Sequence, residues 1–207
     1  SEGFPLVEVD LSDLDPRSGE RESTAALVRG VAAGFVEHGF RIGGFDATMS
    51  STVLPGSGLS SSASVEVLIG TIFNALFNEE AVDTTRIAQI GQFAENTYFG
   101  KPSGLMDQVA CATGGAVAID FADPDRPVIE QVDVSFEDAG LALLVVDTGA
   151  NHADLTDEYA AIPADMKALA AALGKDVLRD VGRQSFFKAV PLLRREVGDR
   201  AVARGIH

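Results

Sequence analysis

The stretch Leu54-Pro-Gly-Ser-Gly-Leu-Ser-Ser-Ser-Ala-Ser64 decides how this 207-residue chain can fold, because glycine and serine here join two apolar segments. The segment before it, Phe45–Val53, has the pattern of a strand, and apolar residues at helical spacing after it predict a buried helix over 61–77. Gly56 and Gly58 permit positive φ and let a ligand approach the backbone closely. Unpaired amides and a favourable dipole at the start of such a helix predict a phosphate site.

Two common phosphate loops do not fit this stretch. A Walker loop requires a lysine after its second glycine, and no lysine occurs between Ser50 and Lys101. A Rossmann turn requires a third glycine at the position that Ser61 occupies. A plainer alternative also stays open, in which a serine of the loop only caps a core helix.

The full loop resembles the second signature motif of the GHMP small-molecule kinases. A second segment, Phe93–Gln108, resembles the galactokinases of that family, in which Ala-Glu is followed by Gly-x-Pro-x-Gly-x-Met-Asp-Gln. The segment Asn151–Tyr159 is also similar to bacterial members, and the likeness begins at about Ser23. Galactokinases transfer the γ-phosphoryl group of Mg-ATP to the anomeric hydroxyl of galactose, so the resemblance implies ATP, Mg²⁺ and galactose as ligands.

The resemblance also implies roles for individual residues. Ser62, with Ser61 as the alternative, and Glu95 would bind Mg²⁺, which prefers oxygen ligands. The phosphates of ATP would lie in the loop formed by Pro55, Gly56, Ser57, Gly58, Leu59, Ser60, Ser61, Ser62, Ala63 and Ser64.

The sugar side of the site is implied in the same way. Asp107 would accept the proton of the sugar hydroxyl as a general base. Gly104 and Tyr159 would line the sugar pocket beside Asp107, although Tyr159 could equally be a core residue with a satisfied hydroxyl. Taken alone, Asp107 could also be an ordinary acidic residue near a helix start.

The expected fold class is α+β, with the GHMP kinase fold. The resemblance implies a part similar to domain 2 of ribosomal protein S5 over 1–135, with the phosphate loop and the catalytic segment, and an incomplete second helix-and-sheet subdomain over 136–207. The family's first, sugar-binding motif and its glycine-rich C-terminal motif have no counterpart in the sequence. We therefore expect the middle of a kinase of about twice this length, without kinase activity by itself.

Other elements are predicted by periodicity and capping signals. Helices are expected after Ser23, after Asp83, and over 105–112, 159–173 and 186–193, with Pro163 kinking the fourth or marking where its regular part begins. Strands are expected at 6–11, 116–120, 128–134 and 141–147, the last as a central strand.

Composition narrows the classes of partner. A net charge of −15 argues against nucleic acid and anionic membranes, which attract positive proteins. The single cysteine, Cys111, excludes an internal disulfide and fits a reducing cytoplasm. The three histidines lack metal-ligand spacing, and neither a membrane-spanning run nor a signal pattern occurs. A cytoplasmic protein with small-molecule ligands is therefore expected.

Two other functions remain open from the sequence. A related kinase could act on N-acetylgalactosamine, arabinose or galacturonate, because the absent first motif carries much of the sugar specificity. A sensor that binds sugar and ATP without catalysis would need no general base, so Asp107 argues against it.

Overall fold

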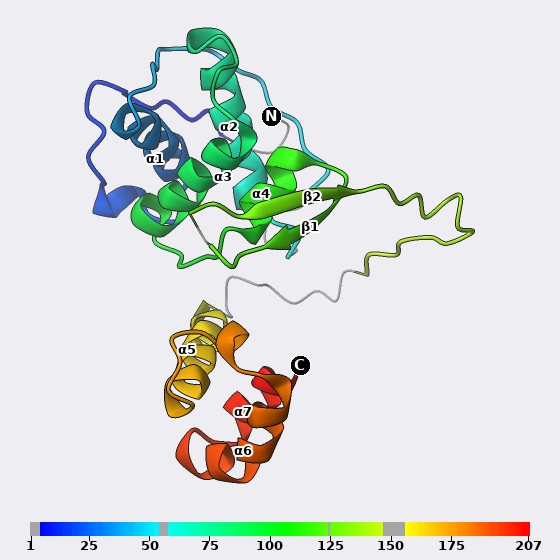
Figure 1. Cartoon of the computed structure of the whole chain (residues 1–207). Coiled ribbons are helices and arrows are strands. Elements are labelled where there is room, and N and C mark those ends of the chain that lie inside the picture. The colour runs from blue at the N-terminus through cyan, green and yellow to red at the C-terminus, as the bar shows by residue number, and fades with distance from the viewer. Residues whose placement is uncertain (1–4, 54–57, 124, 147–155) are drawn as a thin grey trace. The chain divides into compact units, whose positions relative to one another are not determined.

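The computed structural model of the chain describes residues 5–53, 58–123, 125–146 and 156–207. The chain divides into two compact units, Ser1–Asn151 and His152–His207, which we describe separately (Figure 1). The first unit combines helices with a two-stranded sheet, so the expected α+β class is confirmed. The likeness to ribosomal protein S5 and the division into 1–135 and 136–207 stay predictions.

Helices make up most of the first unit. Two of them begin where the sequence predicts: the Ser23 hydroxyl accepts a hydrogen bond from the amide of Ala26, and the Asp83 carboxylate from that of Arg86. The predicted helix at 105–112 is also present, shifted by one residue. The elements are η1 (Ser18–Glu20), α1 (Thr24–Glu37), α2 (Ser61–Phe77), α3 (Thr84–Phe93), the π-helix η2 (Ala94–Phe99) and α4 (Met106–Thr113).

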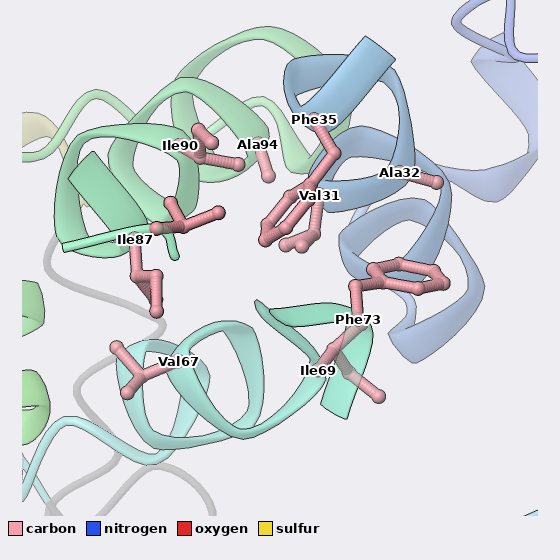
Figure 2. Packing of buried hydrophobic residues seen from close by; sticks show 10 residues of the cluster. Val31, Ala32, Phe35, Val67, Ile69, Phe73, Ile87, Ile90 and Ala94 are labelled. Carbon is pink, nitrogen blue, oxygen red and sulfur yellow. The ribbon is translucent and has the colours of Figure 1, made fainter. Parts of the chain in front are cut away.

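The main core of this unit lies between α1, α2, α3 and η2. Figure 2 shows apolar side chains from these elements gathered in one cluster. Phe35 and Phe73 are 0% exposed. Their rings lie 5.5 Å apart between centroids. Glycine sets the distance between α1 and η2: a Cβ on Gly30 would lie 2.7 Å from the Cβ of Ala94, closer than real contacts allow. The two helices therefore pack backbone to backbone.

The sheet is the antiparallel hairpin of β1 (Ala116–Asp120) and β2 (Val128–Val132), as the sequence predicts. Its register pairs Ala118 with Glu130 and Ile119 with Ile129. The two isoleucines pack against a small core of Ala88, Leu105 and Val109, which come from α3 and from the start of α4. This contact places the hairpin beside the helix that carries Asp107.

Three predicted strands are wrong in the part of the chain that the structure describes. Residues 45–53, 6–11 and 141–146 form no strand, and Asp147 lies outside the described residues. A strand needs a neighbour for its amides and carbonyls, and within the described residues only β1 and β2 supply one another. Phe45 is still packed on the core, whereas Leu144 is 83% exposed.

The second unit is helical. It comprises α5 (Thr156–Ala172), the 3-10 helix η4 (Leu178–Asp180), α6 (Arg183–Glu196) and α7 (Asp199–Ile206). Pro163 lies inside α5 rather than at its end. The predicted apolar face of α6 is confirmed for Phe186 and Leu193, which are buried with Leu169 of α5 and Val202 of α7, whereas Phe187 is exposed. Within the described residues of both units, no helix is long and apolar enough to cross a bilayer.

Candidate functional site

The glycine-serine loop leads into α2 through two left-handed residues. Gly58 has φ +76° and Ser60 has φ +60°, a conformation that is uncommon for a serine. The Ser60 side chain makes no capping hydrogen bond, so it leaves the first-turn amides of α2 without a side-chain cap. The plainer alternative of a simple serine cap therefore does not hold for Ser60. Pro55, Gly56 and Ser57 lie outside the described residues.

The two predicted magnesium ligands lie together although 33 positions separate them. The Ser62 hydroxyl, in the first turn of α2, donates a hydrogen bond of 2.7 Å to Oε1 of Glu95 in η2. The ammonium group of Lys101 lies 3.4 Å from the same carboxylate oxygen. Glu95 itself is only 1% exposed. The alternative ligand Ser61 directly precedes Ser62, and its carbonyl accepts a hydrogen bond from the Ser64 hydroxyl.

This pair fits a magnesium ion that is bound together with a nucleotide. A hydroxyl and a carboxylate are hard oxygen donors, and Mg²⁺ usually takes one or two such protein ligands plus water and phosphate. Among the described residues there is no group of three or more His, Cys, Asp or Glu side chains that could hold a metal. The donors thus suit a cation that arrives with ATP better than a dedicated structural metal site.

Asp107 and the loop open on the same cleft. Gly58, Leu59 and Ser60 line one side of a pocket of about 620 Å³, and Asp107 of α4 lines another. Asp107 is half-buried, in the first turn of α4, where the helix dipole favours a negative charge. The remaining lining residues are mostly apolar: Met106, Ala110, Cys111, Val117, Ile119 and Phe121. The pocket therefore has room for a ligand between the glycine-serine loop and a carboxylate.

Two predicted sugar-site residues are placed differently. Gly104 lies in the exposed turn before α4, and a Cβ there would meet no described atom within 4 Å, so close packing does not explain this glycine. It is not among the residues that line the described pocket. Tyr159 lies in α5 of the second unit. Their predicted contacts with sugar stay predictions.

Cys111 lines the same pocket one turn after Asp107. Burial raises the pKa of its thiol, and the nearby Asp107 and Glu66 carboxyls add to that effect. A protonated thiol is a weak nucleophile. The cysteine therefore acts as part of an apolar wall, as its apolar sequence neighbours predict.

Two buried polar residues close to Glu95 were not predicted from the sequence to belong to the site. Gln108 and Glu66 are both fully buried, and the Gln108 amide donates to Oε2 of Glu66 at 3.0 Å and to Oε2 of Glu95 at 2.8 Å. Burial, followed by the charge of Glu95, raises the pKa of Glu66 to about 8. A signal existed, because Glu66 is the only charged residue of α2 and lies one helical turn after Ser62.

Comparison with known proteins agrees with these observations. Residues 26–115 match the family of GHMP kinases, N terminal domain. The chain is 36% identical over 203 residues to galactokinase of Streptomyces coelicolor, which covers 97% of the chain and 51% of that protein. Galactokinase of Streptomyces lividans is likewise 36% identical, with 97% and 49% covered. Galactokinase of Lactococcus lactis is 33% identical over 148 residues. The chain thus spans about half the length of the Streptomyces relatives.

Proposed function

The chain belongs to the GHMP kinases, and from this premise we propose that it forms part of an ATP-dependent galactokinase. The observation that carries the proposal is the 2.7 Å hydrogen bond between Ser62 and Glu95, which joins the phosphate-loop helix to a buried carboxylate. Relatives that are galactokinases at 36% identity support galactose as the acceptor.

The proposed reaction assigns phosphate binding to the loop. Residues 55–64 hold the triphosphate through main-chain amides and serine hydroxyls, as the first-turn amides of α2, which the Ser60 side chain does not cap, favour. Ser62 and Glu95 hold Mg²⁺, which neutralises phosphate charge when it is bound. Phosphoryl transfer depends mainly on such positioning and charge neutralisation, so no covalent enzyme intermediate is needed.

Asp107 acts on the acceptor. The anomeric oxygen of galactose forms a bond to the γ-phosphorus, the bond from this phosphorus to the β–γ bridging oxygen breaks, and ADP leaves with the bonding electrons. Asp107 accepts the hydroxyl proton, a role worth about 10²–10⁴ in rate for a well-placed general base. Gly104 and Tyr159 are proposed to contact the sugar. The position of Asp107 in the cleft beside Gly58–Ser60 supports this arrangement.

The test is phosphorylation by the protein that carries this chain, with galactose, N-acetylgalactosamine, arabinose and galacturonate offered separately at equal concentration. We expect galactose 1-phosphate and ADP in equal amounts. Preference for another of these sugars would assign the chain to a different sugar kinase. Failure to phosphorylate any of them, together with ATP-dependent thermal stabilisation, would favour the sensor.

The 207 residues alone have a separate expected behaviour. Because they span about half the length of their Streptomyces relatives, we propose that they do not phosphorylate galactose by themselves. ATP binding is still expected, since the described part of the loop and the Ser62–Glu95 pair lie within one compact unit. Turnover of galactose by the isolated chain at a rate usual for kinases, about 1–100 s⁻¹, would contradict this proposal.

A further inference from the structure

One amide ties together the three elements of the candidate site. Gln108 belongs to α4, which also carries Asp107, and its amide nitrogen reaches Glu66 of α2 and Glu95 of η2. All three residues are at most 1% exposed. The two hydrogen atoms of the amide are thus divided between two carboxyl groups, which a hydroxyl donor, with a single hydrogen, cannot do.

The amide bonds only one of the two oxygens of Glu95, and the other oxygen faces the loop side of the site. Oε2 of Glu95 accepts from Gln108, whereas Oε1 accepts from Ser62 and faces Lys101. We propose that Gln108 is a positioning residue, which holds the Glu95 carboxylate from behind so that Oε1 is directed at a divalent cation bound with ATP. This proposal rests on the proposed function and concerns the same site.

Packing keeps the bridging side chain in place. A Cβ added to Gly91 of α3 would lie 3.2 Å from Cγ of Gln108 and 3.2 Å from Cβ of Glu66. Helix α3 therefore packs tightly against the aliphatic parts of both side chains. Fixed stems restrict rotation of the amide, and restricted rotation is what a residue that orients a metal ligand requires.

Charge in the cluster also suits a cation. Burial raises the pKa of Glu66 to about 8, so Glu66 is mostly protonated at neutral pH and serves as an uncharged acceptor. The amide of Gln108 therefore need not bridge two charged carboxylates. Oε1 of Glu95, which faces Ser62 and Lys101, is the oxygen directed at the cation.

The test compares Gln108→Met, which keeps the length of the side chain and removes the amide, with Asn74→Leu. Asn74 is the matched control because it is also a buried amide of the first unit, 7% exposed, but it bonds the main chain of Val82. Mn²⁺ binding in the presence of ATP is followed by electron paramagnetic resonance, and ATP binding without metal by calorimetry. Both are measured on the full chain, with thermal unfolding recorded for each variant.

Loss of a group that orients a metal ligand typically weakens metal binding by about 10–100-fold. We expect Gln108→Met to weaken Mn²⁺ binding by about tenfold while metal-free ATP binding stays unchanged, and Asn74→Leu to lower thermal stability alone. Where activity is measurable, the KM for Mg²⁺ rises and kcat at saturating Mg²⁺ is retained. Equal Mn²⁺ affinity in Gln108→Met and the wild type, or equal losses in both variants, would overturn the proposal.

A second variant covers the case in which Gln108→Met does not fold. Glu66→Met removes the other acceptor of the amide, and we expect it to weaken Mn²⁺ binding, whereas Glu66→Gln keeps an acceptor and restores it. Identical Mn²⁺ affinity in these two variants would equally overturn the proposal. Failure of the proposed function looks different, because the wild type itself would then show no metal-dependent binding of ATP.

Discussion

Arg29 and Gln108 are two fully buried polar side chains of the same unit, and their surroundings differ in kind. The guanidinium of Arg29 forms two hydrogen bonds of 2.8 Å with the two carboxylate oxygens of Glu20. Its third nitrogen donates to the carbonyls of Asp10 and Asp13. The protein supplies partners on every side of this cation, and they fasten the N-terminal segment to α1.

The cluster around Gln108 is incomplete by comparison. Among the described residues, the only buried side-chain nitrogen or oxygen atoms without a partner are Oε1 of Glu66 and Oε1 of Gln108. Buried polar groups in native proteins are nearly always paired, so such exceptions concentrate at sites that meet water or ligands. The contrast separates Arg29, a structural cation whose hydrogen bonds are complete, from the Gln108 cluster, which lies beside the candidate site and retains unpaired oxygens.

The largest expected effect separates activity from stability. Asp107→Asn should lower galactose phosphorylation in the protein that carries this chain by about 10²–10⁴, because the amide cannot accept the proton. ATP affinity and the free energy of unfolding should stay within about 0.5 kcal/mol of the wild type, because asparagine has the same size as aspartate and leaves the packing of α4 unchanged. Steady-state kinetics and urea unfolding provide the measurements. Unchanged turnover would exclude Asp107 as the general base.

The opposite result is expected on the structural side of the comparison. Arg29→Met removes the donor of the half-buried Glu20 carboxylate and of the Asp10 and Asp13 carbonyls, and each acceptor that is left buried without a donor costs about 1–3 kcal/mol. Arg17 still contacts Glu20, at 3.4 Å. Urea unfolding of the full chain measures the loss. The control is Arg41→Met, since Arg41 is exposed and lies 3.7 Å from an exposed carboxylate, Glu79; a change of at most about 1 kcal/mol is expected there. Similar losses in the two variants would contradict the structural role of Arg29.

A third change sharpens the comparison because it disturbs structure and site together. In Gly30→Ala the new methyl group meets the Cβ and Cα of Ala94 at 2.7 and 2.8 Å, and Ala94 precedes Glu95 in η2. Overpacking of this kind costs about 1–3 kcal/mol. We expect weaker Mn²⁺ binding as well, because η2 must shift. Gly44→Ala, where a Cβ meets no atom within 4 Å, is the control and should change neither quantity.

The last prediction is a dependence of stability on pH that Glu66 causes. Glu66 has a pKa of about 8 in the folded chain and about 4.5 when unfolded, so between these values the folded state holds a proton that the unfolded state lacks. Stability from this group therefore falls as pH rises from about 5 to 8, by at most about 1.4 kcal/mol per pH unit, and then levels off. Glu66→Gln should remove this slope in urea unfolding, while Glu37→Gln at the exposed end of α1 should keep it. A slope that persists in Glu66→Gln would contradict the raised pKa.

The helices of the first unit could be predicted from sequence because their signals are local. Ser23 and Asp83 each cap the next helix, and the apolar period of 61–77 gives α2 its observed limits. The strand predictions at 6–11, 45–53 and 141–147 had no such local signal, because whether a strand forms depends on partners distant in sequence. Phe45 illustrates this: its ring packs edge-on against Phe73 at 5.5 Å, so an apolar side chain reaches the core although its segment forms no strand.

The candidate site was predictable to a similar extent. Resemblance to the kinase motifs selected Ser62, Glu95 and Asp107, which the structure brings to one region. Gln108 stood inside a recognised motif but received no role, since only three-dimensional contacts show that its amide joins two carboxyl groups. The π-helix also escaped prediction, because a wider helical turn leaves no periodic signal in the sequence.

This π-helix imposes a requirement on chain length. The carbonyl of Glu95 accepts from the amides of both Gly100 and Lys101, which closes the wide turn at Gly100 with φ +91°. Such a turn contains one residue more than an α-helical turn needs. Deleting a single residue between 95 and 99 would replace this wide turn by an ordinary α-helical turn and change the direction of the side chains within it. The Tyr98 hydroxyl would then leave the carbonyl of Leu14, 2.7 Å away. A design that transfers the Glu95 carboxylate to another scaffold must therefore transfer the whole six-residue π-helix η2.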